Sequence, residues 1–185
     1  MIETFAEDAK RQVSSVAEVS CDLNWDEDVE APVSEEEIQR VVELVLDKEG
    51  VERPCEVSIS IVTDEHIHEL NLEWRQQDKA TDVVSLECER PDDPDLMPGE
   101  PCALGDIVLA PAYIAAQAPR FGTTPADEFR LLLIHGMLHL LGYDHLVDEE
   151  ADFMEAREDE LLSLVKTDAP VSHVVLTRHR VGEDE

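Results

Sequence analysis

The stretch His135–His145, which reads HGMLHLLGYDH, constrains this chain more than any other part of the sequence. His135 and His139 are four residues apart, so on a helix their imidazoles lie one above the other on the same face. His145 comes six residues later and cannot join them if the helix continues. Gly142 lies between them and favours the left-handed conformation that ends many helices. The chain can then turn back and bring His145 to the same point.

Three imidazoles that converge around one open position form the layout of a catalytic zinc site. A single histidine is more typical of an ordinary core or surface position, but three at this spacing around a helix-ending glycine indicate a metal centre. We therefore predict one zinc ion per chain, with His135, His139 and His145 as its ligands.

The size and composition of the chain indicate one globular domain. With 185 residues, 43% hydrophobic and only 4% aromatic, its core must be built mainly from aliphatic side chains. No run approaches the roughly 18 apolar residues needed to span a membrane, and the first residues lack the pattern of a signal peptide. We expect a cytoplasmic protein without a membrane partner. Its four cysteines form no CxxC pair, so we expect reduced thiols.

The formal net charge of −31 is extreme, because 45 acidic residues face only 14 lysines and arginines. Such a charge repels polyanions at long range and argues against a broad nucleic-acid-binding surface. It is compatible with a local basic pocket, because electrostatic screening acts over about 8 Å at physiological salt. Lys79, Arg120 and Arg130 are candidate RNA contacts, but we interpret them as solvated charges on helices.

Apolar periodicity and capping residues predict the order of the elements. Alternating patterns predict strands over 19–23, 57–61, 82–86 and 104–109. Ser34 with Glu37 has the form of a capping box, Asp64 is a candidate cap, and further helices are predicted over 111–117, 124–141 and 148–166. The proline-rich acidic stretch 87–103 is predicted to be a mobile loop.

This order predicts an α+β fold: a small mixed β-sheet of about four strands packed with five or so helices, and the metal site at the end of a central helix. We divide the chain into an N-terminal appendage (residues 1–18), a single metal-dependent hydrolase domain (19–166) and a flexible C-terminal tail (167–185).

The histidine spacing matches HxxxHxxGxxH, the zinc arrangement of the metzincin proteases. In those enzymes a glutamate beside the first histidine acts as the general base, but here that position is Gly136. Peptide hydrolysis would therefore lack its base. A zinc site can also polarise a phosphoryl oxygen, and that chemistry is helped by a guanidinium that binds the phosphate.

Three segments in the same order resemble the YbeY family of bacterial endoribonucleases, the rRNA maturation factors. They are HGMLHLLGYDH at 135–145, LNLEWRQQDKATDVVSL at 70–86 and LGDIVL at 104–109, and the resemblance spans about residues 19–165. It departs from the family at Leu86, where a phenylalanine is usual, and in the longer acidic loop and termini.

The resemblance implies a zinc-dependent endoribonuclease that is specific for single-stranded RNA. Such an enzyme would hydrolyse phosphodiester bonds in maturation of the 3′ end of small-subunit (16S) rRNA and in ribosome quality control. Its partners would be single-stranded or ribosomal RNA and the small ribosomal subunit. The family's three zinc-binding histidines match His135, His139 and His145, and its activity-bearing arginine matches Arg75. By this analogy Arg75 is the catalytic residue and holds the scissile phosphate across a cleft from the metal.

Several alternatives stay open. The nucleophile is either water or the 2′-hydroxyl of the RNA. The charge of −31 also suits a metal-stabilised ribosome-assembly factor with little nuclease activity, and a zinc protease is a third, less favoured function. Asp144 either orients a histidine or ties the loop to backbone amides. Thr81, Asp82 and Ser85 either support the strand or line the cleft.

Overall fold

The computed structural model describes residues 18–144 and 146–165 of the chain. In chain order, its elements are β1 (Val19–Trp25), α2 (Glu35–Lys48), β2 (Cys55–Ile61), α3 (Asp64–Arg75), β3 (Val83–Glu87), β4 (Cys102–Leu109), α4 (Pro111–Gln117), the 3-10 helix η1 (Ala118–Phe121), α5 (Pro125–Leu140) and α6 (Asp148–Leu164).

The four strands form one mixed sheet in the order β1-β2-β4-β3. β1, β2 and β4 are parallel, whereas β3 pairs with β4 in the antiparallel direction. Because β3 lies at the end of this order, it is an edge strand. The predicted α+β class, with about four strands and five or so helices, is confirmed.

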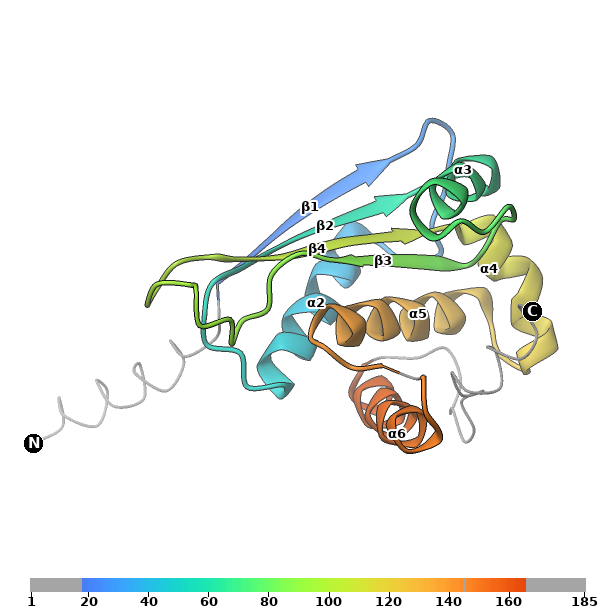
Figure 1. The fold of residues 1–185 in the computed structure, drawn as a ribbon. Helices are drawn as coiled ribbons and strands as arrows, with labels where there is room; N and C mark the ends of the chain where they lie inside the picture. The colour runs from blue at the N-terminus through green and yellow to red at the C-terminus, as the bar shows by residue number, and fades with distance from the viewer. Residues whose placement is uncertain (1–17, 145, 166–185) are drawn as a thin grey trace, which may run out of the picture.

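Helices cover both faces of the sheet (Figure 1). α2 and α5 pack on one face, and α6 packs against the far side of α5. α3 covers the other face, where its Ile67 shares a small apolar cluster with Val84 and Val108. Neighbouring side chains on β3 therefore point in opposite directions: Val84 faces α3, whereas Val83 belongs to the larger core shared with α5.

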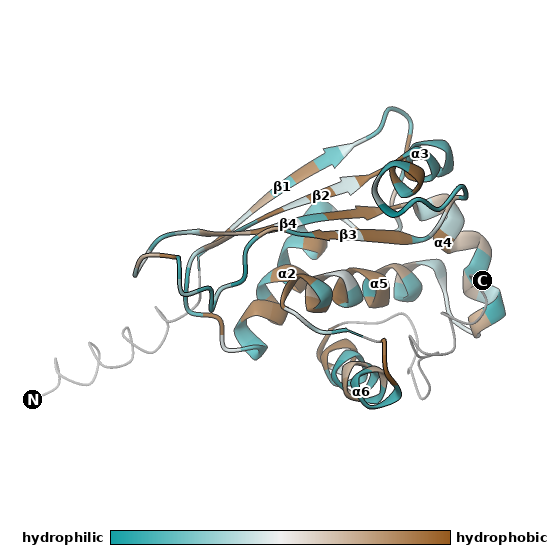
Figure 2. Cartoon of the chain, in the orientation of Figure 1, coloured by the Kyte–Doolittle hydropathy of each residue, from teal (hydrophilic) through white to brown (hydrophobic). Residues whose placement is uncertain are grey.

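α5 is the central buried helix of the main core. Thr124 caps it by accepting a hydrogen bond from the amide of Asp127, and Pro125 occupies its first position. The helix is buried around most of its circumference, because it contacts the sheet on one side and α2 and α6 on others. Hydrophobic residues alternate with hydrophilic ones along it (Figure 2). Its position fixes every side chain that it carries.

Two local predictions near the helix starts need correction. Thr63, and not Asp64, caps α3, because its hydroxyl accepts from the amide of His66. Ser34 caps α2 as predicted and accepts from the amide of Glu37. The Glu37 carboxylate, however, accepts a hydrogen bond from Arg130 on α5 at 2.6 Å. The Glu37 carboxylate therefore forms a long-range ion pair, whereas in a capping box it would have bound the backbone amide of Ser34.

The acidic loop after β3 is held by one guanidinium. Arg53 Nη1 donates to the carbonyl oxygens of Met97 at 2.6 Å and Glu100 at 2.7 Å, and its Nε donates to that of Pro91 at 3.2 Å. Three backbone acceptors on one planar group fix the course of residues 91–100.

No helix among the described residues is long and apolar enough to cross a membrane. The predicted appendage and tail fall outside the described residues, apart from Glu18.

Candidate functional site

The helix α5 ends at a turn around Gly142, as the sequence predicted. The amide of Gly142 donates to the carbonyl of His139, and the amide of Tyr143 donates to that of Leu138, both at 3.0 Å. These two bonds form a Schellman motif. Gly142 has a φ of 103°, a value that residues with a side chain rarely adopt. The chain therefore leaves the helix abruptly, directly after the second histidine.

His135 and His139 lie side by side on α5. Their rings are nearly perpendicular, with centroids 4.4 Å apart, and their Nε2 atoms are separated by 3.0 Å. The predicted convergence of these two imidazoles is what the structure shows. The third predicted ligand, His145, lies outside the described residues.

The other ring nitrogen of each histidine has an oxygen partner. Nδ1 of His135 lies 2.5 Å from Oε1 of Glu158, and Nδ1 of His139 lies 2.9 Å from the carbonyl oxygen of Tyr143. A carbonyl oxygen only accepts, and a carboxylate oxygen accepts from a histidine N–H, so each Nδ1 is assigned the hydrogen. In the neutral imidazoles the lone pairs are then on the two Nε2 atoms, which face each other.

This donor set fits a divalent metal ion. Two lone pairs only 3.0 Å apart are favourable when a cation binds both. For zinc–nitrogen bonds of about 2.0–2.1 Å, two ligands of a tetrahedral site lie about 3.3 Å apart, close to the observed separation. Within residues 18–144 and 146–165, no three His, Cys, Asp or Glu side chains form a group that could hold a metal.

Glu158 is a site residue that the sequence reasoning missed. It comes from α6, and only 1% of its side chain is exposed. A carboxylate that binds the distal nitrogen of a ligand histidine fixes the ring and increases its basicity. Its position did carry a signal, because it lies four residues after Met154 and three before Leu161, both of which are apolar and buried in α6. An acidic residue in an apolar stripe indicates a buried partner.

Tyr143 links the histidine pair to the neighbouring helices. Its carbonyl binds His139, and its hydroxyl donates to Glu49 at 2.9 Å. Burial, together with the nearby Glu49 carboxylate, raises the pKa of Tyr143, so the hydroxyl stays protonated. Glu49 also accepts from Arg157 of α6 at 2.6 Å. The turn after α5 is thus tied to both α2 and α6.

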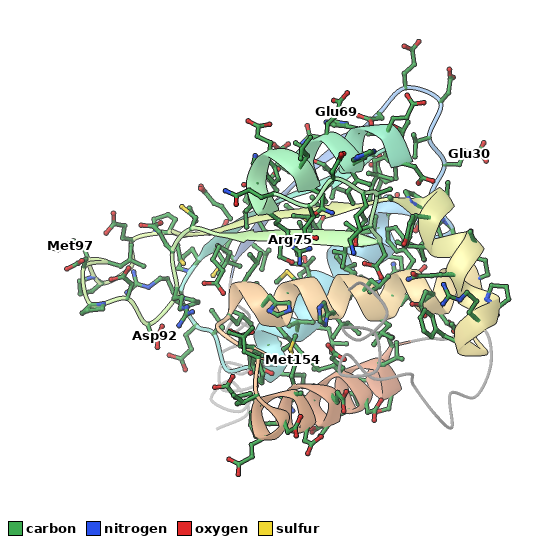
Figure 3. The ribbon with its side chains drawn as sticks, turned by 45° about the vertical axis from the view of Figure 1, so that its right-hand side comes forward. Glu30, Glu69, Arg75, Asp92, Met97 and Met154 are labelled. Carbon is green, nitrogen blue, oxygen red and sulfur yellow. The ribbon has the colours of Figure 1, made fainter. Side chains whose placement is uncertain are left out.

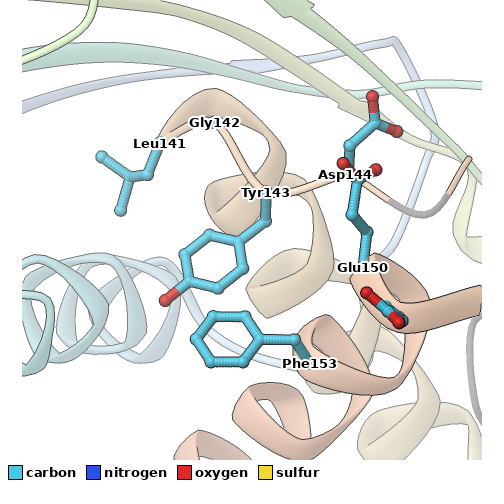
Figure 4. A pocket seen from close by; sticks show the side chains of 7 residues that line it. Leu141, Gly142, Tyr143, Asp144, Glu150 and Phe153 are labelled. Carbon is cyan, nitrogen blue, oxygen red and sulfur yellow. The ribbon is translucent and has the colours of Figure 1, made fainter. Parts of the chain in front are cut away.

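A pocket of about 530 Å³ opens beside this turn (Figure 4). The Tyr143 ring stacks on Phe153 with a centroid distance of 5.7 Å and an interplanar angle of 10°. The lining residues are Leu141, Gly142, Tyr143, Asp144, Glu149, Glu150 and Phe153. Asp144 therefore lies on the pocket wall, whereas Glu158 and the Tyr143 carbonyl provide the oxygens that bind the two histidines.

Gly136 occupies the place of the protease general base, and the sheet leaves little space beside it. A Cβ added there would lie 3.0 Å from Cγ2 of Ile107 and 3.3 Å from Oγ of Ser85. Such separations are tighter than ordinary contact, so the side chains of Ile107 and Ser85 would have to move to make room for a glutamate. Ser85 therefore faces α5 at Gly136, the residue that follows His135 in the sequence.

Asp82 supports the strand. One of its carboxylate oxygens accepts from the amide of Val83 at 2.7 Å, and the other accepts from the side chain of Gln117 at 2.8 Å. These bonds tie the start of β3 to the end of α4.

Arg75 is the last residue of α3 and is exposed to solvent. It is followed by Gln76 in the left-handed conformation, which turns the chain toward β3. Figure 3 places Arg75 beside β3, the edge strand that contacts both α3 and α5. Arg75 and the histidine pair therefore belong to helices on opposite faces of the sheet, with β3 common to both.

Comparison with known proteins agrees with this architecture. The family described as Endoribonuclease YbeY matches residues 21–166. Endoribonuclease YbeY of Paramagnetospirillum magneticum is 45% identical over 62% of this chain and 70% of its own length. That of Bacillus velezensis is 38% identical over 69% of this chain and 83% of its own. The solution structure of TM1509 from Thermotoga maritima superposes with a TM-score of 0.54 at 26% identity, over 78% of this chain and 87% of that one.

Proposed function

The chain belongs to the YbeY family of endoribonucleases, and we propose that it is a zinc-dependent enzyme that cleaves single-stranded RNA. One observation carries the zinc dependence: the Nε2 atoms of His135 and His139 meet at 3.0 Å while oxygens hold both Nδ1 atoms. We further propose that the enzyme acts in the cytoplasm, in maturation of the 3′ end of 16S rRNA and in ribosome quality control.

One ion would be held by His135, His139 and His145. Bound there, zinc supplies a Lewis acid that polarises a phosphoryl oxygen and lowers the pKa of water. The protein's own contribution is to fix the orientation and tautomer of each imidazole, so that both Nε2 atoms are directed at the same point. The buried carboxylate of Glu158 does this for His135, and the Tyr143 carbonyl does it for His139.

Arg75 is proposed to bind the scissile phosphate. The planar guanidinium carries a positive charge, and its shape matches two phosphate oxygens. It would neutralise the charge that develops on these oxygens as the phosphodiester is attacked. Either water or the 2′-hydroxyl of the RNA can serve as nucleophile. Gly136 provides no carboxylate beside the histidines, which disfavours a protease mechanism.

The proposed substrate is RNA presented by the small ribosomal subunit. A net charge of −31 slows the approach of a free polyanion at long range. At contact distance this repulsion is screened, so a few arginines can still bind phosphates. The same charge favours a second candidate function, a metal-stabilised ribosome-assembly factor with little nuclease activity.

Elemental analysis tests the site. The purified wild-type protein should contain one zinc per chain, and His139→Ala should lose most of it. His68→Ala, which removes a partly exposed histidine on α3, should keep it. Equal zinc in all three proteins would refute the ligand assignment.

A cleavage assay on single-stranded RNA separates the two functions. If the protein is a nuclease, Arg75→Ala should reduce cleavage strongly and leave the zinc content unchanged. Cleavage that is equal in wild type and Arg75→Ala, and that a chelator does not affect, would indicate a contaminant and favour the assembly factor.

A further inference from the structure

A second arginine lies against the turn that follows the histidine pair. A Cβ added to Gly142 would be 3.1 Å from both Cζ and Nη1 of Arg90, so the guanidinium covers this glycine. Gly142 is three residues after His139 and donates its amide to the carbonyl of that histidine. Arg90 comes from the loop after β3, more than forty residues earlier in the chain.

The backbone before Arg90 is well fixed. The amide of Cys88 donates to the carbonyl of Leu104 at 3.0 Å, and that of Glu89 donates to the carbonyl of Ala103 at 2.8 Å. The pairing of β3 with β4 thus extends up to the residue before Arg90. After Arg90, the contacts of Arg53 hold the rest of the loop. The side chain therefore starts from a rigid position.

The guanidinium is available to a ligand. Half of the Arg90 side chain (51%) is exposed, and its ion pair with Glu87 is exposed as well, with a separation of 3.2 Å. Exposed pairs of this kind contribute little and are easily exchanged. Arg130 and Arg157 differ, because each is largely buried and bonded to two carboxylates at 2.6–2.8 Å.

Arg90 and Arg75 bracket the same strand in sequence. Arg75 precedes β3 and Arg90 follows it, and Ser85 in the middle of β3 faces Gly136, next to His135. We propose that Arg90 binds a backbone phosphate of single-stranded RNA that neighbours the scissile phosphate, beside the turn that follows the histidine pair. This inference rests on the proposed nuclease function and adds a substrate-binding residue to it.

Direct binding tests the proposal. The probe is a fluorescent single-stranded oligonucleotide whose 2′-hydroxyls are methylated, and its affinity is measured by anisotropy across a range of salt concentrations. The variants are Arg90→Gln, Arg90→Lys and, as a control with the same charge change, Arg40→Gln. Arg40 is exposed on α2, which contributes no residue to the histidine pair.

Arg90→Gln should weaken binding about fivefold at low salt and reduce the slope of log affinity against log salt by about 0.7, the value for one lost phosphate contact on a single strand. Arg90→Lys should keep the wild-type slope, and Arg40→Gln should match wild type. Melting temperatures measured in parallel identify a purely structural role: a lower value for Arg90→Gln with an unchanged slope would overturn the proposal.

Cleavage of unmodified RNA by the same proteins tests the nuclease assignment separately from the phosphate contact at Arg90. If the wild type cleaves RNA but Arg90→Gln and Arg40→Gln bind alike, Arg90 is no phosphate contact and the nuclease assignment stands. If the wild type binds with the predicted dependence on Arg90 but cleaves nothing, the nuclease assignment is wrong and the phosphate contact stands. A wild type that does not bind the oligonucleotide overturns the contact.

Discussion

The carboxylate of Glu158 lies 2.5 Å from Nδ1 of His135, across the interface between α6 and α5. This contact connects α6 to the histidine pair of the candidate site. It sets the orientation and the tautomer of a histidine that is 23 residues away in the sequence. The acidic helix α6 is therefore part of the site as well as a cover for the core.

Glu158→Gln should weaken zinc binding while the fold is retained. The amide has nearly the same size but no charge, so His135 loses the partner that increases its basicity. Loss of such a partner typically costs about 10–100-fold in metal affinity. Competition with a coloured chelator measures the change. Glu160→Gln on the same helix, which is largely exposed, is the matched control and should bind zinc as the wild type does. An affinity equal in both variants would show that Glu158 has no role in the metal centre.

Gly136→Glu should destabilise the protein without creating a protease. The new side chain would start only 3.0 Å from Ile107 and would bring a carboxylate into the contact between α5 and the sheet. Overpacking and burial of a charged group together should cost about 3 kcal/mol or more in the free energy of unfolding, measured by denaturant titration. Gly136→Ala should cost less, because a methyl group needs a smaller shift. A Gly136→Glu protein that is as stable as wild type and cleaves casein would contradict this packing.

Arg130→Ala should lower the free energy of unfolding by about 3–5 kcal/mol. Arg130 bonds Glu37 of α2 and Asp127 of α5, both at 2.6 Å, and its removal leaves the buried Asp127 carboxylate without this cation. Denaturant titration measures the loss. The exposed Arg40→Ala on α2 should stay within about 0.5 kcal/mol of wild type. Similar effects of the two substitutions would mean that the buried ion pairs contribute nothing.

Cys102 should resist alkylation below pH 9, because only the thiolate reacts. Burial raises the pKa of Cys102 from 9.0 to about 12, so its thiol stays protonated in the folded protein. The unfolded chain loses this proton near pH 9 and the folded one only near pH 12. Over that window the folded state binds more protons, and stability should therefore fall as the pH rises. Mass spectrometry after iodoacetamide treatment at pH 8 should find label on the exposed Cys88 and none on Cys102. Equal labelling would contradict the burial.

Local chemistry explains why much of the fold could be predicted. The alternation in β2, the cap at Ser34, Pro125 at the start of α5 and Gly142 after its end each act within a few residues. The pairing of His135 with His139 follows from helix geometry alone. Errors arose where a tertiary contact decided the outcome. Arg130 was interpreted as a solvated charge, but it is buried between α2 and α5.

The parts of the site that could not be predicted depend on contacts between distant segments. Glu158 reaches His135 because α6 packs on α5, and Arg90 lies against Gly142 from a loop that the β3–β4 pairing and Arg53 hold in place. No spacing rule connects residues so far apart. The roles of Arg75 and His145 remain predictions from the resemblance and from the spacing of the histidines.

The most direct test of zinc-dependent RNA cleavage at this histidine pair is a chelation and restoration assay. The wild type and His139→Ala are stripped of metal, supplied with one equivalent of zinc, and incubated with a single-stranded RNA. We predict that stripping abolishes cleavage, and that zinc restores it to the wild type but not to His139→Ala. Cleavage that persists without metal, or that returns equally in both proteins, would contradict the assignment.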